Sequence, residues 1–264
     1  MDNGTEKISI LKLSERGGSS IEDVVAKEFP LTIILNNQEL VTLLCSPTNL
    51  KYLAVGFLFS EGLLKSKDEI KKILVDDRRG VVRVETEGDE ELAGHALFKR
   101  FITSGCGRGV SFYSAADAQG QVRVESRLEI STLEVLALVN EFQHHSQIYR
   151  ATGGVHSAAL CDTTNIIVFS EDIGRHNAID KIFGECLLND ITTDDHIIIT
   201  SGRISSEILL KVARRNVPII VSKSAPTSLG VILADDLGLT LVGFVRGKRM
   251  NVYTHAGRIA TDGK

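Results

Sequence analysis

The sequence predicts a mixed α/β protein in which a small α+β half precedes a regular α/β half. The chain has 264 residues, enough for one large or two ordinary domains with a real core. In the second half, short apolar strands alternate with helical stretches, as in an α/β layer sandwich. Trp is absent and aromatic residues are few, so the core must be built from Ile, Leu, Val and Ala, as in a parallel sheet.

The first half has no regular alternation of strands and helices, which indicates an α+β arrangement. Pro47 favours the start of a helix that we expect to run to about Glu61. The other elements expected are strands over 31–35 and 40–45 around the turn Asn36-Asn37-Gln38, a short helix over 67–74 and a strand over 81–84.

The second half begins with a clear helix signal. Ser131-Thr132-Leu133-Glu134 forms a capping box, and the helix that it starts is predicted to reach Tyr149. The strands expected after it cover 157–161, 165–169, 197–200, 218–221 and 239–245, and the helices 176–188, 204–215 and 227–237. We therefore predict a domain over residues 1–127 and a second over 128–264.

The charge and hydropathy patterns bear on which function classes are favoured and on where in the cell the protein is expected. The formal net charge is −4 and no long basic run appears, so nothing favours a nucleic-acid partner. The sequence has no run of 18 apolar residues, so it predicts no membrane span. The amino terminus lacks the basic and apolar segments of a signal peptide, so we expect a cytoplasmic protein.

Polar residues gather where the predicted strands end, which is where α/β folds bind ligands. These groups cover 170–177, 201–207, 222–228 and 246–249. Glycines and hydroxyl residues before helices expose backbone N–H groups, and Arg203, Lys223, Arg246, Lys248 and Arg249 add positive charge. Together these features predict a binding site for a phosphorylated, nucleotide-like ligand. The alternative is that these Ser, Thr and Asp residues only cap helices and form turns.

Several familiar signatures are absent. There is no P-loop, no Gly-x-Gly-x-x-Gly and no Gly-x-Ser-x-Gly. His156 and His176 have the chemistry of catalytic or metal-binding residues, but a lone histidine is more often structural. Cys45, Cys161 and Cys186 have apolar neighbours, which indicates buried, inert thiols.

Cys106 differs, because it lies in the loop Thr103-Ser104-Gly105-Cys106-Gly107-Arg108-Gly109. Three glycines allow a tight or mobile backbone, and nothing apolar shields the sulfur. Arg108 would stabilise a thiolate, the nucleophilic form. We therefore interpret Cys106 as a nucleophile for covalent transfer; the alternative is an exposed cysteine with no role.

With these segments assembled, the chain resembles the FdhD family of formate dehydrogenase accessory sulfurtransferases over about residues 28–255. The matching segments are Thr103-Ser104-Gly105-Cys106-Gly107, Thr152-Gly153-Gly154-Val155-His156, Glu171-Asp172-Ile173-Gly174-Arg175-His176-Asn177-Ala178 with Asp180-Lys181, Thr200-Ser201-Gly202-Arg203, Ser222-Lys223-Ser224-Ala225-Pro226-Thr227 and Gly243-Phe244-Val245-Arg246-Gly247.

The resemblance implies a sulfur carrier that takes persulfide sulfur from a cysteine desulfurase on Cys106. It then passes this sulfur to the molybdenum cofactor of formate dehydrogenase, a bis(molybdopterin guanine dinucleotide). It also implies a cytidine-deaminase-like three-layer αβα second domain and a homodimer. The cofactor-binding residues expected are Phe244, Val245, Arg246, Gly247, Lys248, Arg249, Ser201, Arg203, Lys223, Ser224, Arg175 and His176.

Two departures limit what the resemblance implies. Many family members carry Cys-x-x-Cys in the loop, but here the second position is Gly109, which leaves a single-cysteine route. Zinc deaminases need a His/Cys-x-Glu element and a Pro-Cys-x-x-Cys element, and neither is present, so no zinc is expected. Two alternatives stay open: a chaperone that inserts the molybdenum cofactor without transferring sulfur, and a zinc-dependent nucleoside hydrolase.

Overall fold

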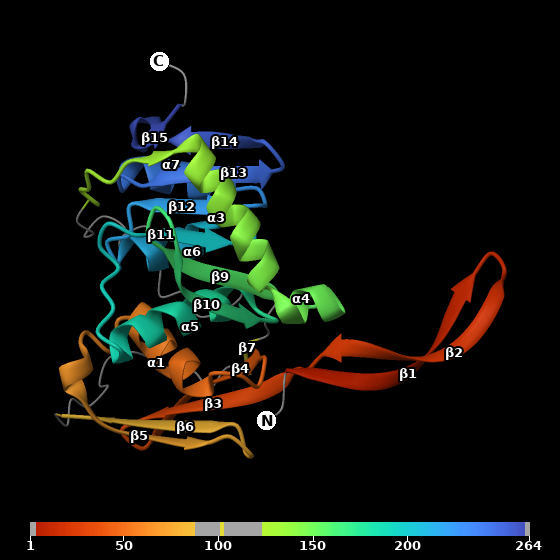
Figure 1. Cartoon of the computed structure of the whole chain (residues 1–264). Coiled ribbons are helices and arrows are strands. Elements are labelled where there is room, and N and C mark those ends of the chain that lie inside the picture. Colours follow the sequence, from red (N-terminus) through yellow and green to blue (C-terminus); the bar gives the residue numbers. More distant parts are fainter. Residues whose placement is uncertain (1–3, 88–100, 103–122, 262–264) are drawn as a thin grey trace.

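Two sheets form the body of the molecule, as the computed structural model of residues 4–87, 101–102 and 123–261 shows (Figure 1). A six-stranded sheet has the order β10-β9-β11-β12-β13-β14, and a five-stranded sheet the order β5-β6-β3-β4-β7. Helices cover both, so the mixed α/β prediction is confirmed.

The six-stranded sheet brings four strand ends to one edge. β11 pairs parallel with β12, and β12 pairs parallel with β13, whereas β9 is antiparallel to both β10 and β11. The carboxyl ends of β10, β11, β12 and β13 therefore meet at one edge, where β9 begins. The strand bounds are β9 His156–Cys161, β10 Ile166–Asp172, β11 Ile197–Thr200, β12 Ile219–Ser222, β13 Thr240–Arg246 and β14 Arg249–Thr254.

Helices on both faces make this sheet the middle of three layers. α3 (Thr132–His145) packs on one face, and α5 (Arg175–Leu188), α6 (Ser206–Ala213) and α7 (Ser228–Asp236) cover the other. Ile197 and Ile199 join the core under α3, while Ile198 joins the core under α5 and α6. Burial on both faces explains the unbroken apolar run of β11. The layers are αβα as predicted; the cytidine-deaminase-like arrangement stays a prediction.

The five-stranded sheet belongs to the first half of the chain. Its bounds are β3 Phe29–Leu35, β4 Gln38–Cys45, β5 Ile70–Asp76, β6 Val81–Thr86 and β7 Phe101–Ile102. Asn36 and Asn37 both have positive φ, 45° and 66°, as a tight hairpin turn between β3 and β4 requires. This confirms the predicted strand pair and its turn.

Helix α1 (Leu50–Ser60) joins the first half to α5 (Figure 1). A Cβ added at Gly56 would lie 1.7 Å from the carbonyl oxygen of Asp180, and one at Gly184 would lie 1.9 Å from that of Tyr52. The two helix backbones therefore touch, and glycine is required at both crossing points. The division at residues 127 and 128 stays a prediction.

Some predicted elements were wrong. The helix over 67–74 is a 3₁₀ turn, η1 (Lys67–Glu69), followed by β5, because β6 offers an antiparallel edge to the Ile- and Val-rich segment. The helix predicted to reach Tyr149 ends at His145, and the short α4 (Gln147–Thr152) follows Ser146. α1 begins at Leu50 rather than Pro47, since Asn49 is left-handed with φ 55°.

Sequence reasoning also missed several elements. β1 (Thr5–Ser14) and β2 (Gly17–Ala26) form a hairpin that projects from the body beside α4 (Figure 1). Leu11 and Leu13 on it are 63% and 72% exposed, so no buried face marks these strands in the sequence. Also missed were β14 and the small pairing of β8 (Ile130–Ser131) with β15 (Ile259–Ala260), which follows the 3₁₀ turn η2 (Ala256–Arg258).

No helix in the described ranges is both long and apolar enough to span a membrane.

Candidate functional site

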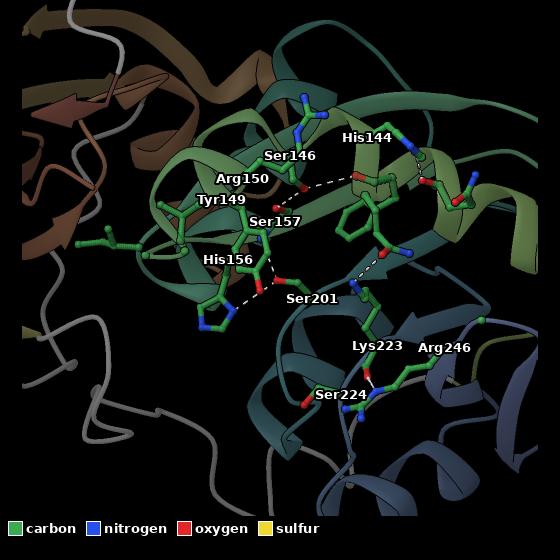
Figure 2. Close-up of a pocket in the computed structure, with 18 residues that line it drawn as sticks. His144, Ser146, Tyr149, Arg150, His156, Ser157, Ser201, Lys223, Ser224 and Arg246 are labelled. Atoms are coloured by element: carbon green, nitrogen blue, oxygen red, sulfur yellow. Dashed lines mark hydrogen bonds between the residues drawn. The ribbon is translucent and has the colours of Figure 1, made fainter. Parts of the chain in front are cut away.

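A pocket of about 1000 Å³ opens at the edge where the four strands end (Figure 2). One wall is the carboxyl end of α3 with α4, and the other is formed by the loops after β11, β12 and β13. The segment that leads into β9 lies between them. The lining residues are Asn140, Phe142, Gln143, His144, Ser146, Tyr149, Arg150, Gly153, Gly154, Val155, His156, Ser157, Ile173, Ser201, Lys223, Ser224, Arg246 and Gly247.

The charge of the pocket is positive. Arg150, Lys223 and Arg246 supply three cationic side chains, and His144 and His156 add two imidazoles. Among the residues that the structure describes, no Asp or Glu belongs to the lining. Such a wall attracts anions, and it is large enough for a ligand of nucleotide size.

Lys223 and Arg246 are held next to each other at one end of the pocket (Figure 2). The Lys223 ammonium donates to Gln143 Oε1 at 2.9 Å, and Arg246 Nε donates to the Lys223 carbonyl at 3.2 Å. The Arg246 guanidinium lies 5.5 Å from the centre of the Phe244 ring. Burial, and then the charge of Arg246, lower the pKa of Lys223. An anion placed between these two cations would relieve their mutual repulsion.

Ser201 connects the loop after β11 to the start of β9 at the pocket. Its Oγ accepts from the Ser157 backbone N–H at 3.0 Å, and its own N–H donates to the Ser157 carbonyl at 3.0 Å. The same hydroxyl lies 3.3 Å from His156 Nδ1, and Ser157 Oγ is 2.8 Å from Ser146 Oγ. These bonds tie the break between α3 and α4 to the start of β9 and to the loop after β11.

The half-buried His156 ring lies between Ser201 and the start of α5. Burial, and then the charge of Arg175, lower the pKa of His156, while Asp172 opposes them. Gly202 gives the two side chains room: a Cβ there would lie 2.9 Å from Arg175 Cβ and 3.5 Å from His156 Nδ1.

The structure brings five of the predicted cofactor-binding residues to the pocket. These are Ser201, Lys223, Ser224, Arg246 and Gly247. The other predicted residues do not line it: Phe244, Val245, Lys248, Arg249, Arg175, His176 and Arg203. Val245 is buried in the core under α3. The binding role of the whole set stays a prediction.

His176 has a different environment from the one predicted for it. Its Nε2 lies 3.5 Å from Glu207 Oε2. Burial, followed by the positive charges of Lys211 and Arg175, nevertheless lowers the pKa of His176 to about 3. It is therefore a neutral, mostly enclosed side chain outside the pocket wall.

The α4 wall was not predicted. The Glu171 carboxylate accepts from the backbone N–H groups of Ile148 and Tyr149, both at 3.0 Å, which fixes the start of α4. Tyr149 and Arg150 then line the pocket. Ser146 was the sequence signal for a break between α3 and α4. Serine is a poor helix former, and it lies inside the pattern that we interpreted as one continuous helix.

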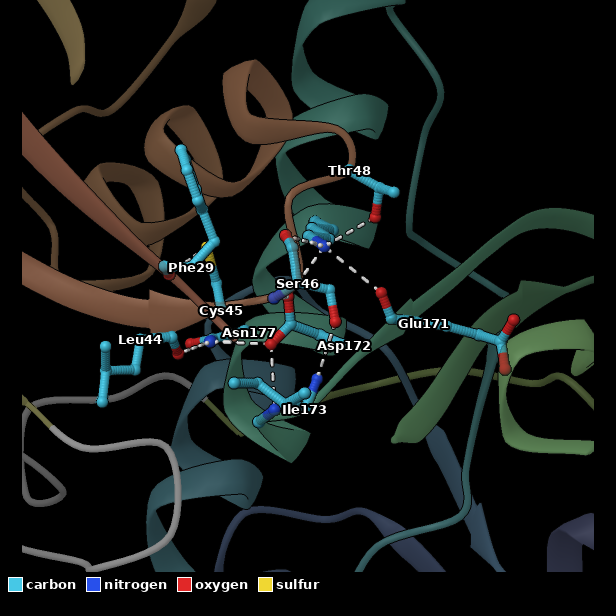
Figure 3. Close-up of polar contacts among 11 residues, drawn as sticks. Phe29, Leu44, Cys45, Ser46, Thr48, Glu171, Asp172, Ile173 and Asn177 are labelled. Carbon is cyan, nitrogen blue, oxygen red and sulfur yellow. Dashed lines mark hydrogen bonds and ion pairs between the residues drawn. The ribbon is translucent and has the colours of Figure 1, made fainter. Parts of the chain in front are cut away.

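The distinctive segment from Asp172 to Lys181 serves mainly to join the two halves (Figure 3). The Lys181 ammonium lies 2.7 Å from Asp172 Oδ2, and both side chains are fully buried. Asp172 also accepts from the backbone N–H of Ser46 at 3.0 Å and from Asn177 Nδ2 at 2.9 Å, while Asn177 donates to the Leu44 carbonyl at 2.9 Å. Asp172, Asn177 and Lys181 support the pocket without lining it, whereas Ile173 of the same segment lines it.

The cysteines separate as predicted where the structure describes them. Cys45, Cys161 and Cys186 are buried free thiols, and burial raises the pKa of each to about 12. They are therefore inert near neutral pH. Cys106 lies outside the described residues.

Comparisons with known proteins agree on one family. The model of the FdhD/NarQ family matches residues 26–260. The chain is 47% identical over 237 residues to a sulfur carrier protein FdhD of Bacillus pumilus, with 90% of each chain covered. It is 46% identical over 241 residues to that of Bacillus subtilis, covering 91% of this chain and 92% of the relative.

A solved structure extends the similarity to the fold. A formate dehydrogenase accessory protein from Desulfotalea psychrophila superposes with a TM-score of 0.80 at 28% identity. The superposition covers 97% of this chain and 99% of the other.

Proposed function

The chain belongs to the FdhD/NarQ family, and from that premise we propose that it is a cytoplasmic sulfur carrier for formate dehydrogenase. In this proposal Cys106 accepts sulfur from the persulfide of a cysteine desulfurase. The sulfur then goes to a bis(molybdopterin guanine dinucleotide) substrate, and the carrier works as a homodimer.

The observation that favours this proposal most is the positive pocket. The dinucleotide substrate has several phosphates, and the lining offers Arg150, Lys223 and Arg246 without a carboxylate among the described residues. The pocket volume, about 1000 Å³, suits a nucleotide-sized portion of that substrate. The residues present therefore fit the anionic part of the proposed substrate.

The sulfur step needs one nucleophilic thiol. The Cys106 thiolate attacks the outer sulfur of the donor persulfide, a new S–S bond forms, the donor S–S bond breaks, and the donor cysteine leaves as a thiolate. The exchange has no net oxidation or reduction. Burial makes Cys45, Cys161 and Cys186 unsuitable, so Cys106 is the remaining cysteine of the four in the sequence.

The test is a persulfide assay on the full chain. After incubation with a cysteine desulfurase and cysteine, we expect mass spectrometry to find one added sulfur on Cys106 in the wild type and none in Cys106→Ala. Cys161→Ala is the matched control, since it removes a buried thiol. Sulfur that loads equally on Cys106→Ala would contradict the proposal.

The chaperone alternative has one observation in its favour: no described cysteine lines the pocket, so ligand binding there does not depend on those thiols. It predicts that Cys106→Ala still supports full formate dehydrogenase activity in a strain relying on that variant. The sulfur-carrier proposal predicts that this activity is lost while guanosine diphosphate binding is kept.

A further inference from the structure

His156 is a titratable group at the junction between the pocket and the positive start of α5. Its ring is half-buried, lines the pocket and is aligned by Ser201 (Figure 2). The sulfur step proposed above does not use it. A histidine in this position adds a charge to the pocket only when it binds a proton.

Ser201 suits both protonation states of His156. The Ser201 hydroxyl already accepts from the Ser157 N–H, and it has one proton and one further lone pair. With a neutral ring, the hydroxyl donates to Nδ1. With a protonated ring, the hydroxyl rotates and accepts from Nδ1–H at the same 3.3 Å separation. The ring therefore gains a proton without losing its position.

The charges around the ring oppose protonation while no anion is present. Arg175 comes from the start of α5, beside His176, which stays neutral, and Asp172 comes from the end of β10, where it pairs in register with His156. The Asp172 carboxylate is already paired with Lys181 at 2.7 Å. The balance of charge is therefore positive, and it adds to burial, the larger cause, in lowering the pKa of His156. A bound anion would reverse this balance.

We propose that His156 takes up a proton when an anionic group binds in the pocket, so that ligand binding is coupled to protonation of this ring. The inference rests on the proposed function, because the phosphates of the substrate supply the negative charge. His156 is a positioning residue in this scheme: it helps to hold the anionic part of the substrate and takes no part in the sulfur exchange.

The coupling has a defined sign. Binding raises the pKa of His156 from its lowered value, so the complex binds more protons than the empty protein and the ligand. Affinity then falls as pH rises through the interval between the two pKa values, by up to about tenfold per pH unit. Loss of this ring removes that part of the pH dependence.

Calorimetric titration of the full chain with guanosine diphosphate measures the coupling. Titrations at one pH in buffers of different ionisation enthalpy give the number of protons taken up. We expect net uptake for the wild type and a clear reduction for His156→Gln. The terminal phosphate of the nucleotide also titrates, and the His156→Gln titration measures that share so that it can be subtracted.

The control is His196→Gln, which removes a histidine before β11, at the opposite end of that strand from the pocket, and should leave proton uptake unchanged. If His156→Gln does not fold, nitrogen NMR of the wild-type ring, with and without guanosine diphosphate, reports its protonation directly. Binding with equal uptake in wild type and His156→Gln would overturn the coupling alone. Absence of saturable binding would overturn the proposed pocket function and the coupling together.

Discussion

At the scale of single residues, the buried pair of Lys181 and Asp172 holds the segment after β4 against the end of β10. Both side chains are fully buried, and Lys181 also donates to the carbonyls of Ser46 and Glu171 and to Thr48 Oγ1. Moving two charges out of water costs free energy, so a buried ion pair is tolerated only when the remaining hydrogen bonds of both groups are made. Here they join the segment after β4 to the end of β10.

Replacing Lys181 with Met should therefore destabilise the protein by about 3–5 kcal/mol, because Asp172 would be left buried without its counter-charge. The measurement is urea unfolding followed by circular dichroism. Lys67→Met is the matched control: Lys67 pairs with Asp190 at the surface, where the side chains are 42% and 74% exposed, and should cost at most about 1 kcal/mol. Equal losses in the two variants would show that burial is not the cause.

Residue identities at the pocket were only partly predictable. Ser201 and Lys223 follow parallel strands and Arg246 ends one, so the edge rule brings them together. The rule does not give side-chain direction: Val245 alternates into the core beside them, and His176 faces Glu207. These side-chain orientations depend on strand register and helix packing, which cannot be predicted from a single sequence.

At the scale of elements, the contact between α1 and α5 holds the two halves together. Gly56 and Gly184 let the helix backbones touch, whereas glycine inside a helix normally costs about 1 kcal/mol relative to alanine. The close approach also places α5 so that Asp180 accepts from Ser60 Oγ at 2.6 Å. The gain in packing therefore outweighs the loss in helix propensity.

Gly56→Ala should destabilise the protein by about 3 kcal/mol or more, because the new Cβ would lie 1.7 Å from the Asp180 carbonyl oxygen and force the helices apart. Thermal unfolding measures the effect. Gly257→Ala is the control, since nothing lies within 4 Å of its added Cβ, and its effect should stay within about 0.5 kcal/mol. A stabilised Gly56→Ala protein would show that helix propensity dominates there.

Elements were predictable where a buried face marked them. β11 and β12, buried along their whole length, and the Ser131 capping box of α3 were found from the sequence. The β1–β2 hairpin was missed because its side chains are mostly exposed, and β5 was taken for a helix because Ile70 and Ile73 also fit helical spacing. The break at Ser146 depends on Glu171, which is distant in sequence.

At the scale of the whole molecule, a mostly enclosed histidine at the start of α5 makes stability depend on pH. His176, at the start of α5, has a folded pKa of about 3 against an ordinary value of 6.5. Burial and the charges of Lys211 and Arg175 keep it neutral in the folded state. Below about pH 6.5 the unfolded chain binds a proton at this ring that the folded chain excludes.

Stability should therefore be greatest above pH 6.5 and fall as pH decreases from 6.5 towards 3, with His176 contributing a slope of up to about 1.4 kcal/mol per pH unit.

His176→Gln removes this contribution, so its free energy of unfolding should fall less steeply between pH 6 and pH 4. The slope, rather than the absolute stability, is the informative quantity. Urea unfolding at several pH values gives the slope, with His196→Gln, which removes a half-buried histidine before β11, as the control. A His176→Gln slope equal to the wild-type slope would mean that His176 is protonated in the folded protein.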